Sequence, residues 1–588
     1  MELKKKMRSV LALGLAAAMS FSLVACGGDK AAEDAPDDGS EWTVDVFSAT
    51  ANKQGEQQGW FAKLVKDKFN ITLNVIAPNV SGGDTVFDTR SAAGDLGDLI
   101  IVGTGNGRLE KLVKSGLIAD MTPYWDDMEH VQQYQSAVDS VTELAGESGK
   151  DGIWGVPQGV SSQSPLKSQE GYEPGTAPYI RWDYYSKIGY PELKDLDDLL
   201  DALKQMQGLA RQETGEDDIY AISLFKDWDG DVMQNAMAVA SWFGYSQQGS
   251  MFINADGSDV QSAADEGGIY EQALAFLNKA ERMGLVDPDS TTQDWDTMQN
   301  KVQNGKTMLS LWSWLGKPRM NSQENKDKGV GFMLAPLQNM NVYSPGFTPN
   351  GDAATIIAIG SKAEHKDRLA KFIDWLYSSE GAYASASNSG GSICPQELGC
   401  WTMEGDEPVL TEFGVESQTG DHANLQVPED MGGSTYDNGV STLNFKTIQQ
   451  NDVDPDTGYT YNPQLWPSQQ DQSALFKDWA AHMGNATSDI NYLETNGKIA
   501  VAAGATYITP QEDSAVSATR SAIKTEIVNA SWQAVMAGSE DEFDKILSAM
   551  RTQIDELGYA SVREVDESNA EGLIAAREAV VAEYEENQ

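Results

Sequence analysis

Short apolar runs alternate with helical patterns in the first part of the chain, and this alternation most constrains the fold. Residues 41–50 (EWTVDVFSAT) alternate apolar and polar side chains, as a strand with one buried face does. A helical pattern follows at 58–70, a second strand pattern at 71–78, and the apolar run LIIVG at 99–103 precedes another helical pattern. Strands that alternate with helices predict an α/β fold, with a mostly parallel sheet covered by helices on both faces.

Two later helices are predicted from their starts. Ser361 is followed three residues later by Glu364, and Ser539 by Glu542, and in both cases apolar residues then repeat at helical spacing. A Ser and a Glu at this spacing form a capping box, in which each side chain accepts a hydrogen bond from a free backbone N–H group of the first turn. We therefore expect helices over 361–381 and 539–558.

The N-terminus predicts export. A basic segment ending at Arg8 precedes an apolar stretch at 10–25, and LVACGG at 23–28 resembles a bacterial lipobox with Cys26 as the acylation site. We assign 1–25 to a lipoprotein signal peptide and 26–41, which is acidic and lacks large apolar residues, to a flexible tether. Beyond the signal no run of 18 apolar residues occurs. The mature chain is expected on the extracytoplasmic face of the cell membrane.

The net charge excludes several classes of partner. The sequence has 42 Lys and Arg against 89 Asp and Glu, a formal charge of −47. Nucleic acid and anionic lipid surfaces would be repelled, and an anionic ligand would need a local basic pocket. A neutral polar ligand such as a sugar meets no such barrier.

Motifs for catalysis, cofactors and metals are incomplete. Gly103 and Gly105 begin a dinucleotide-type turn, but Arg108 stands where the third glycine is needed. The acidic loops 226–231 and 451–460 both lack the Glu that a calcium loop of the EF-hand type requires at position 12. We expect no catalytic residue, cofactor or metal, although convergent carboxylates of a glycoside-active enzyme stay open as an alternative.

The only cysteines beyond Cys26 are Cys394 and Cys400. In an exported protein they can form a short-loop disulfide. Two buried free thiols are the alternative, and the spacing does not decide between them.

Several segments occur in a recognisable order along the chain: GDLGDLIIVG, LEKLVKSGLIADMTPYW, KDGIWGVP, VQNGKTMLSLWSW and HKDRLAKFIDWLYSSEG. Together they resemble the family 1 extracellular solute-binding proteins of bacterial carbohydrate ABC transporters, the maltose-binding-like receptors. The C-terminal part is similar to the large lipoprotein branch of that family, typical of Gram-positive bacteria.

The resemblance implies a two-lobed, type II periplasmic-binding-protein-like fold with discontinuous lobes joined by a hinge. We expect lobe 1 to comprise 42–157 and 336–430, and lobe 2 to comprise 158–335 and 431–588. The implied function is a monomeric, lipid-anchored receptor that captures a carbohydrate, with an oligosaccharide preferred, and delivers it to an ABC permease. The alternatives are the glycoside-active enzyme and a receptor for another small solute.

Aromatic residues are the first candidates for ligand binding. Trp312 and Trp314 lie two apart in an expected strand, so both indoles would face the same side and offer an apolar platform to a sugar ring. The resemblance favours Trp314 over Trp312, for which core packing is the alternative. In the loop 226–231, Trp228 could stack on a sugar and Asp229 could accept hydroxyl hydrogen bonds.

Loops at the ends of lobe 1 strands supply further candidates. The resemblance places Thr104, Asn106 and Arg108 in a loop that contacts ligand. Asn350 and Asp352 precede a lobe 1 strand and could contact ligand at the edge of the cleft. Trp401 could reach the cleft, although packing in the core is favoured for it.

Overall fold

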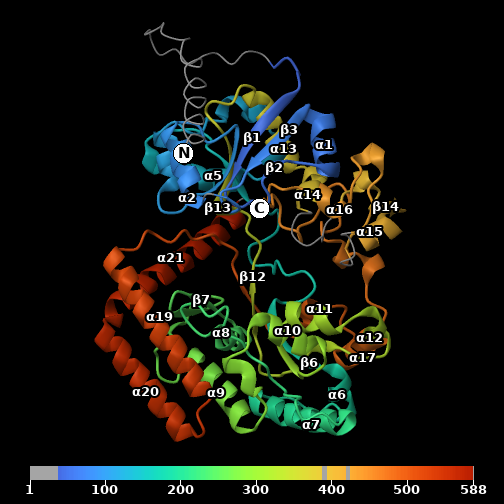
Figure 1. Cartoon of the computed structure of the whole chain (residues 1–588), viewed down its shortest axis with the longest axis vertical. Helices are drawn as coiled ribbons and strands as arrows, with labels where there is room; N and C mark the ends of the chain where they lie inside the picture. The colour runs from blue at the N-terminus through green and yellow to red at the C-terminus, as the bar shows by residue number, and fades with distance from the viewer. Residues whose placement is uncertain (1–36, 82, 387–393, 419–423, 587–588) are drawn as a thin grey trace, which may run out of the picture. The chain divides into compact units, whose positions relative to one another are not determined.

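The apolar residues that the structure describes form four clusters, which group into two main cores. The computed structural model describes residues 37–81, 83–386, 394–418 and 424–586 (Figure 1). One core takes its residues from 44–160 and 353–466, and the other from 177–342 and 475–562. We call these parts the first and second lobe. The predicted signal peptide, Cys26 and most of the tether lie outside the described residues.

The first lobe is built on a mixed six-stranded sheet. Its strands run in the order β2-β3-β1-β4-β13-β5: Gly55–Glu56, Ile71–Ile76, Trp42–Ser48, Leu99–Gly103, Asp352–Ile359 and Val156–Gln158. β1 is parallel to β3 and β4, with Val46 opposite Val75 and Leu99, while β2, β13 and β5 join antiparallel. The expected parallel arrangement holds for β3, β1 and β4, but the sheet is mixed, because β2 and β13 run in the opposite direction. β13 enters the sheet after the chain returns from the second lobe.

Helices and a hairpin complete the first lobe. The hairpin is β14 (Trp401–Glu404) and β15 (Glu407–Leu410). The helices are α1 (Gly59–Phe69), α2 (Gly83–Ala92), α3 (Arg108–Lys114), α4 (Glu129–Gln132), α5 (Gln135–Ala145), α13 (Lys366–Leu376), α14 (Ser379–Ala386), α15 (Glu412–Glu416) and α16 (Tyr436–Gly439). The expected α/β alternation at the start of the chain is confirmed.

The second lobe has a small antiparallel sheet, β10-β6-β11, and many helices. Its strands are β6 (Thr176–Arg181), β10 (Leu309–Trp312) and β11 (Phe332–Leu334), then the antiparallel set β7 (Tyr245–Gln248), β8 (Met251–Asn254) and β9 (Val260–Ser262) and the parallel pair β12 (Val342–Pro345) and β16 (Ile499–Ala502). Its helices up to residue 495 are α6 (Trp182–Lys187), α7 (Leu196–Thr214), α8 (Gln234–Ser241), α9 (Ile269–Arg282), α10 (Trp295–Gln303), α11 (Ser313–Met320), α12 (Gln323–Asp327), α17 (Ala474–His482) and α18 (Asp489–Thr495).

Three long helices end the chain. α19 (Ser514–Val535), α20 (Glu540–Leu557) and α21 (Tyr559–Glu586) pack against one another (Figure 1). The Oγ of Ser539 accepts a hydrogen bond from the Glu542 backbone N–H at 3.2 Å, which confirms the predicted start of α20. The other predicted start is wrong. α13 begins at Lys366 because the backbone of Ser361 is held in a turn by the Leu117 carbonyl, at 3.1 Å.

The chain passes between the cores three times. Val160 belongs to the first core and Ala177 to the second, and Val342 belongs to the second core while Ala353 packs in the first lobe. After Trp466 in the first core, Leu475 is the next core residue and lies in the second. This packing favours crossings somewhat later along the chain than the expected boundaries at 157, 336 and 430.

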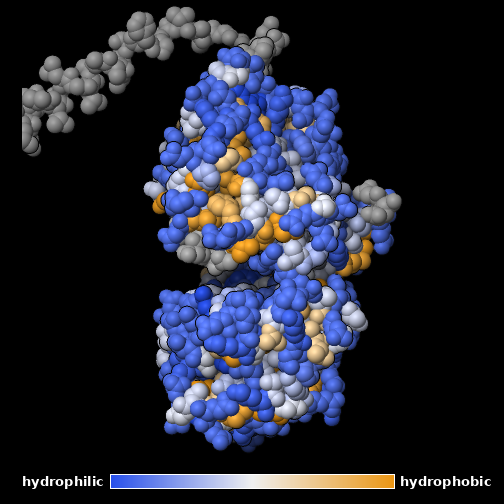
Figure 2. All heavy atoms as spheres, turned by 90° about the vertical axis from the view of Figure 1, so that its right-hand side faces the viewer, coloured by the Kyte–Doolittle hydropathy of each residue, from blue (hydrophilic) through white to orange (hydrophobic). Residues whose placement is uncertain are grey.

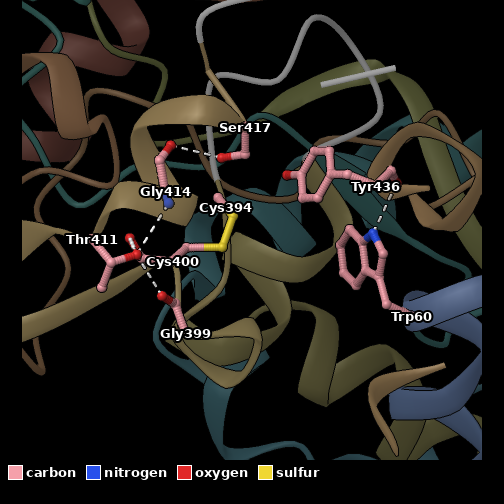
Figure 3. The surroundings of a disulfide bond; sticks show 8 residues. All are labelled: Trp60, Cys394, Gly399, Cys400, Thr411, Gly414, Ser417 and Tyr436. Atoms are coloured by element: carbon pink, nitrogen blue, oxygen red, sulfur yellow. Dashed lines mark hydrogen bonds between the residues drawn. A yellow bond between two sulfur atoms is a disulfide. The ribbon is translucent and has the colours of Figure 1, made fainter. Parts of the chain in front are cut away.

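A close contact explains why the segment after 430 stays with the first lobe. Trp60 Nε1 donates a hydrogen bond to the Tyr436 carbonyl at 3.0 Å, and the two rings stack with centroids 5.7 Å apart (Figure 3). A Cβ on Gly439 would come within 2.2 Å of the Trp60 ring. Only glycine permits this approach, which fixes α16 against α1.

Cys394 and Cys400 form a disulfide (Figure 3). The bond closes a loop beside the start of the β14–β15 hairpin. There the Thr411 hydroxyl donates to the Gly399 carbonyl at 2.7 Å and accepts from the Gly414 N–H at 3.1 Å. Of the two alternatives left open by the sequence, the structure has the disulfide.

Replacing both cysteines with serine is expected to lower the free energy of unfolding by about 2 kcal/mol, the entropy of closing so short a loop in the unfolded chain. Urea unfolding of the wild-type and double-serine proteins measures the difference. Wild-type protein kept in reductant serves as the matched control and should unfold like the variant. Equal stability of oxidised and reduced wild type would contradict the prediction.

Polar and charged residues dominate the face that Figure 2 draws. Apolar residues gather there in limited patches. Within the part of the chain that the structure describes, no helix combines the length and apolar character needed to cross a membrane.

Candidate functional site

Four tryptophans from three separate segments meet in the second lobe. Trp228 lies in the loop before α8, Trp295 begins α10, Trp312 ends β10 and Trp314 lies in the first turn of α11. The ring centroids of Trp228 lie 4.4 Å from Trp295 and 5.4 Å from Trp314, and those of Trp312 and Trp314 lie 5.3 Å apart. We call these four residues the tryptophan cluster.

Solvent exposure divides the tryptophan cluster into a buried part and a half-exposed part. Trp312 is 3% exposed and packs on Phe225, with centroids 5.8 Å apart, whereas Trp228 is 42% and Trp314 40% exposed. The expectation that Trp312 and Trp314 share one strand face is wrong, because the strand ends at Trp312 and the chain turns directly into α11. Trp314 therefore presents its indole to solvent above a buried Trp312.

Two aspartates hold the cluster's loops in place. The Asp227 carboxylate accepts a hydrogen bond from the Trp295 backbone N–H at 2.8 Å. One Asp229 oxygen accepts from Trp532 Nε1 at 2.6 Å and the other from the Gln234 N–H at 2.9 Å. Burial raises the pKa of the Asp229 carboxyl, and these hydrogen bonds act in the opposite direction. The structure thus ties Asp229, expected to bind ligand, to α8 and α19.

A buried ion pair network anchors α11, the helix that carries Trp314. Lys317 Nζ lies 2.6 Å from Asp489 and 2.5 Å from Glu173, and it sits 4.9 Å from the centroid of the Tyr179 ring. Burial alone would lower the pKa of Lys317, but the charges of Asp489 and Glu173 raise it above its ordinary value. The network joins α11 to α18 and to the segment before β6.

The candidate ligand-binding residues that follow β4 in the first lobe line two different cavities. Thr104 is 5% exposed, and its hydroxyl donates to the Ala353 carbonyl at 2.6 Å. It lines a cavity of about 570 Å³ together with Asn350. Asn106 and Arg108 line another cavity, of about 440 Å³, where the Arg108 guanidinium lies over the Phe87 ring at 4.9 Å.

The remaining first-lobe candidates are engaged in contacts within the protein. Asn350 Nδ2 donates to Glu583 of α21 at 2.7 Å, and Asp352 accepts from Gln158 Nε2 at 2.8 Å. Trp401 is 4% exposed and packs on Trp466 with centroids 5.6 Å apart. Its packing in the first core is the alternative that the sequence favoured.

Comparison with known proteins places this architecture in a family. The sequence model of the bacterial extracellular solute-binding protein family matches residues 52–383, more than half of the chain. The chain belongs to this family. No curated protein sequence matches it.

Solved structures similar to this solute-binding protein share its fold at low sequence identity. An HMO-binding, ABC-transporter-associated protein from Bifidobacterium longum infantis has a TM-score of 0.54 and 16% identity, covering 91% of this chain and 99% of its own. A Streptococcus pneumoniae ABC-transporter substrate-binding protein, FusA, solved with kestose, gives 0.53 and 14%, covering 93% and 100%. The alginate-binding protein AlgQ2 gives 0.51 and 14%, covering 92% and 98%. The expected type II periplasmic-binding-protein-like fold is confirmed.

Uncharged hydrogen-bond donors hold the acidic loop of the solute-binding protein, residues 451–460, in place. Asp452 accepts hydrogen bonds from the N–H and hydroxyl groups of Ser162 at 2.7 and 2.9 Å. Asp454 accepts from the hydroxyls of Ser379 at 2.6 Å and Thr457 at 3.0 Å. These carboxylates join the loop to the crossing segment and to α14.

One group of possible metal ligands lies close together among the described residues: Asp37, Asp38 and His365. The Arg368 guanidinium, however, hydrogen-bonds both oxygens of Asp37, and this lowers the pKa of that carboxyl to about 2. Because the Arg368 guanidinium already binds the Asp37 carboxylate, these residues are better explained as contacts that hold residues 37–40 in place than as a metal site.

Trp295 is the cluster member that sequence reasoning missed. The sequence shows it directly after Asp294, whose side chain caps α10 by accepting from the Thr297 N–H at 2.8 Å. That pattern predicts a helix start there. Nothing in it indicates that the indole meets Trp228, 67 positions earlier, since only the tertiary fold brings the two together.

Proposed function

We propose that this protein is a receptor for an extracellular carbohydrate, an oligosaccharide in preference to a monosaccharide. The observation that carries the proposal is the pair of half-exposed indoles of Trp228 and Trp314 over a buried Trp312. The apolar C–H face of a sugar ring packs on such a surface, and aromatic residues commonly line ligand sites together with a few polar groups.

The proposed mechanism is capture by lobe closure. The tryptophan cluster supplies the second-lobe wall, and the loop at 104–108 with Asn350 and Asp352 supplies candidates on the first. A ligand that touches both lobes only in the closed state shifts the equilibrium toward that state. The closed protein then delivers its sugar to a membrane permease of an ABC transporter. Neighbours that are described as ABC-transporter binding proteins support this step.

Membrane attachment through Cys26 completes the proposal. The predicted signal peptide and lipobox support a lipid-anchored receptor on the extracytoplasmic face, and we propose that it acts as a monomer. Neutral sugars also meet no electrostatic barrier from a chain of charge −47. We further propose that the protein binds its ligand without converting it, in keeping with a family of binding proteins.

Calorimetry of the chain from residue 27 onward against oligosaccharides of β-mannan, xylan, α-glucan, fructan and host glycans tests the function. We expect reversible binding of at least one class, with the sugar recovered intact by chromatography. Absence of binding across the panel would overturn the carbohydrate proposal. Appearance of shorter products would instead support a glycoside-active enzyme.

A further inference from the structure

The structure describes three buried arginines, and one of them lacks an acidic partner. Arg181 pairs with Asp183 at 2.7 Å, and Arg368 pairs with Asp37. Arg577 of α21 is 8% exposed, and its Nη2 donates to the Tyr343 hydroxyl at 3.1 Å. Within the described residues its Nη1 has no hydrogen-bond partner, and the guanidinium forms no ion pair. In a chain with 89 Asp and Glu residues, a buried arginine without an acidic partner is unusual.

Arg577 lines a cavity of about 380 Å³ that lies among α21, the end of β16 with the residue after it, the β8–β9 turn and Leu166. A buried charge is expensive unless it is paired, and an unmet buried donor adds to the cost. The protein therefore holds an incomplete site, which a group with a negative charge and hydrogen-bond acceptors would complete. We call this cavity the Arg577 pocket.

The rest of the lining limits the chemistry of the occupant. Its large apolar side chains are all aliphatic, from Leu166, Val501, Ile574 and Val581, and the lining includes no aromatic ring for stacking a sugar. Such walls favour methylene groups over hydroxyl-rich molecules.

The rim limits the charge of the occupant. Asp256, Glu578 and Glu585 line the mouth and are exposed, so each repels an anion, and the repulsion doubles with the anion's charge. One negative charge suffices to pair with Arg577, and a carboxylate matches the geometry of a guanidinium. A monocarboxylate is therefore favoured over a phosphate.

We propose that the Arg577 pocket is a second ligand site, which binds a small aliphatic monocarboxylate with its carboxylate on Arg577 and its hydrocarbon tail against the aliphatic walls. The site is separate from the tryptophan cluster and does not depend on the carbohydrate function. It takes an acid of about four to six carbons, since a cavity of 380 Å³ is small for a ligand site.

Calorimetry at constant ionic strength with butyrate and hexanoate tests the proposal. Each buried methylene strengthens apolar binding by about fourfold, so hexanoate, with two more methylenes, is expected to bind about fifteenfold more tightly than butyrate. Hexan-1-ol, which has the same tail without the charge, and inorganic phosphate are both expected to bind at least tenfold more weakly than hexanoate.

Three variants test whether hexanoate binds in the Arg577 pocket. Arg577→Met keeps the length and apolar stem but removes the charge, and should weaken hexanoate binding at least tenfold. Ala582→Trp, at an exposed position of α21 that lines the pocket, should block binding while leaving Arg577 in place. Glu585→Gln removes one repelling rim charge and should tighten binding.

Trp314→Ala, outside the pocket, is the matched control and should bind hexanoate like the wild type. Three results would overturn the proposal: no binding of hexanoate to the wild type, equal binding by wild type and Arg577→Met, or binding of phosphate as tight as that of hexanoate. None of these results bears on the oligosaccharide panel, so the two proposals fail separately.

Discussion

Trp314→Ala is expected to weaken binding of the cognate oligosaccharide by tenfold or more. The indole is 40% exposed above the buried Trp312 and beside the half-exposed Trp228, so its outer face is free to pack against a sugar ring. Losing such a contact costs about 1.4 kcal/mol or more, which corresponds to the tenfold loss. Calorimetry with the sugar identified in the panel measures the change.

A matched control separates binding from general damage. Trp125 is a half-buried tryptophan of the first lobe, outside the tryptophan cluster, and Trp125→Ala should leave the affinity within about twofold of wild type. Both variants should unfold in one transition, monitored by circular dichroism. If Trp314→Ala binds the sugar as tightly as wild type while folding normally, the cluster is not the sugar site.

The residue types of the site were predictable from sequence, but their assembly was only partly so. The Trp-x-Trp pair and Trp228 could be singled out because an indole offers an apolar face to a sugar ring, and because the resemblance to sugar receptors favours Trp314 in particular. The orientation of Trp314 was missed because two residues of alternation cannot reveal that β10 ends at Trp312. Trp295 was missed because its partner is distant along the chain.

Local signals predicted the fold well where tertiary contacts agreed with them. The pattern at 58–70 gives α1, and the Ser539 capping box starts α20 as expected. The similar box at Ser361 failed because a hydrogen bond to the distant Leu117 carbonyl holds Ser361 in a turn. The sequence placed the segment after 430 in lobe 2. Contacts with distant residues, such as that of Gly439 with Trp60 and that of Leu443 with Ser48, associate it with the first lobe instead.

Lys317→Met is expected to lower the free energy of unfolding by about 3–5 kcal/mol at pH 8, the usual cost of removing one partner from a buried ion pair. Asp489 has a side chain only 1% exposed and would be left with a charge that lacks its cation. Burial already raises the pKa of the Asp489 carboxyl, with Lys317 opposing that rise, so its pKa in the variant is higher still. The folded variant then binds a proton more readily than the unfolded chain. Its stability deficit should therefore shrink as the pH falls from 8 to 5, measured by urea unfolding at both values.

Two comparisons make the test specific to burial. Lys187 pairs with Glu213 at 2.6 Å on the surface, with side chains 45% and 39% exposed, so Lys187→Met should cost less than about 1 kcal/mol with little pH dependence. Lys317→Met combined with Asp489→Leu removes both buried charges and should recover part of the loss. Since Lys317 anchors the helix that carries Trp314, the single variant should also bind sugar more weakly at pH 8. A deficit that does not change with pH, and that the second substitution does not reduce, would mean that Lys317 acts through packing alone and not through its charge.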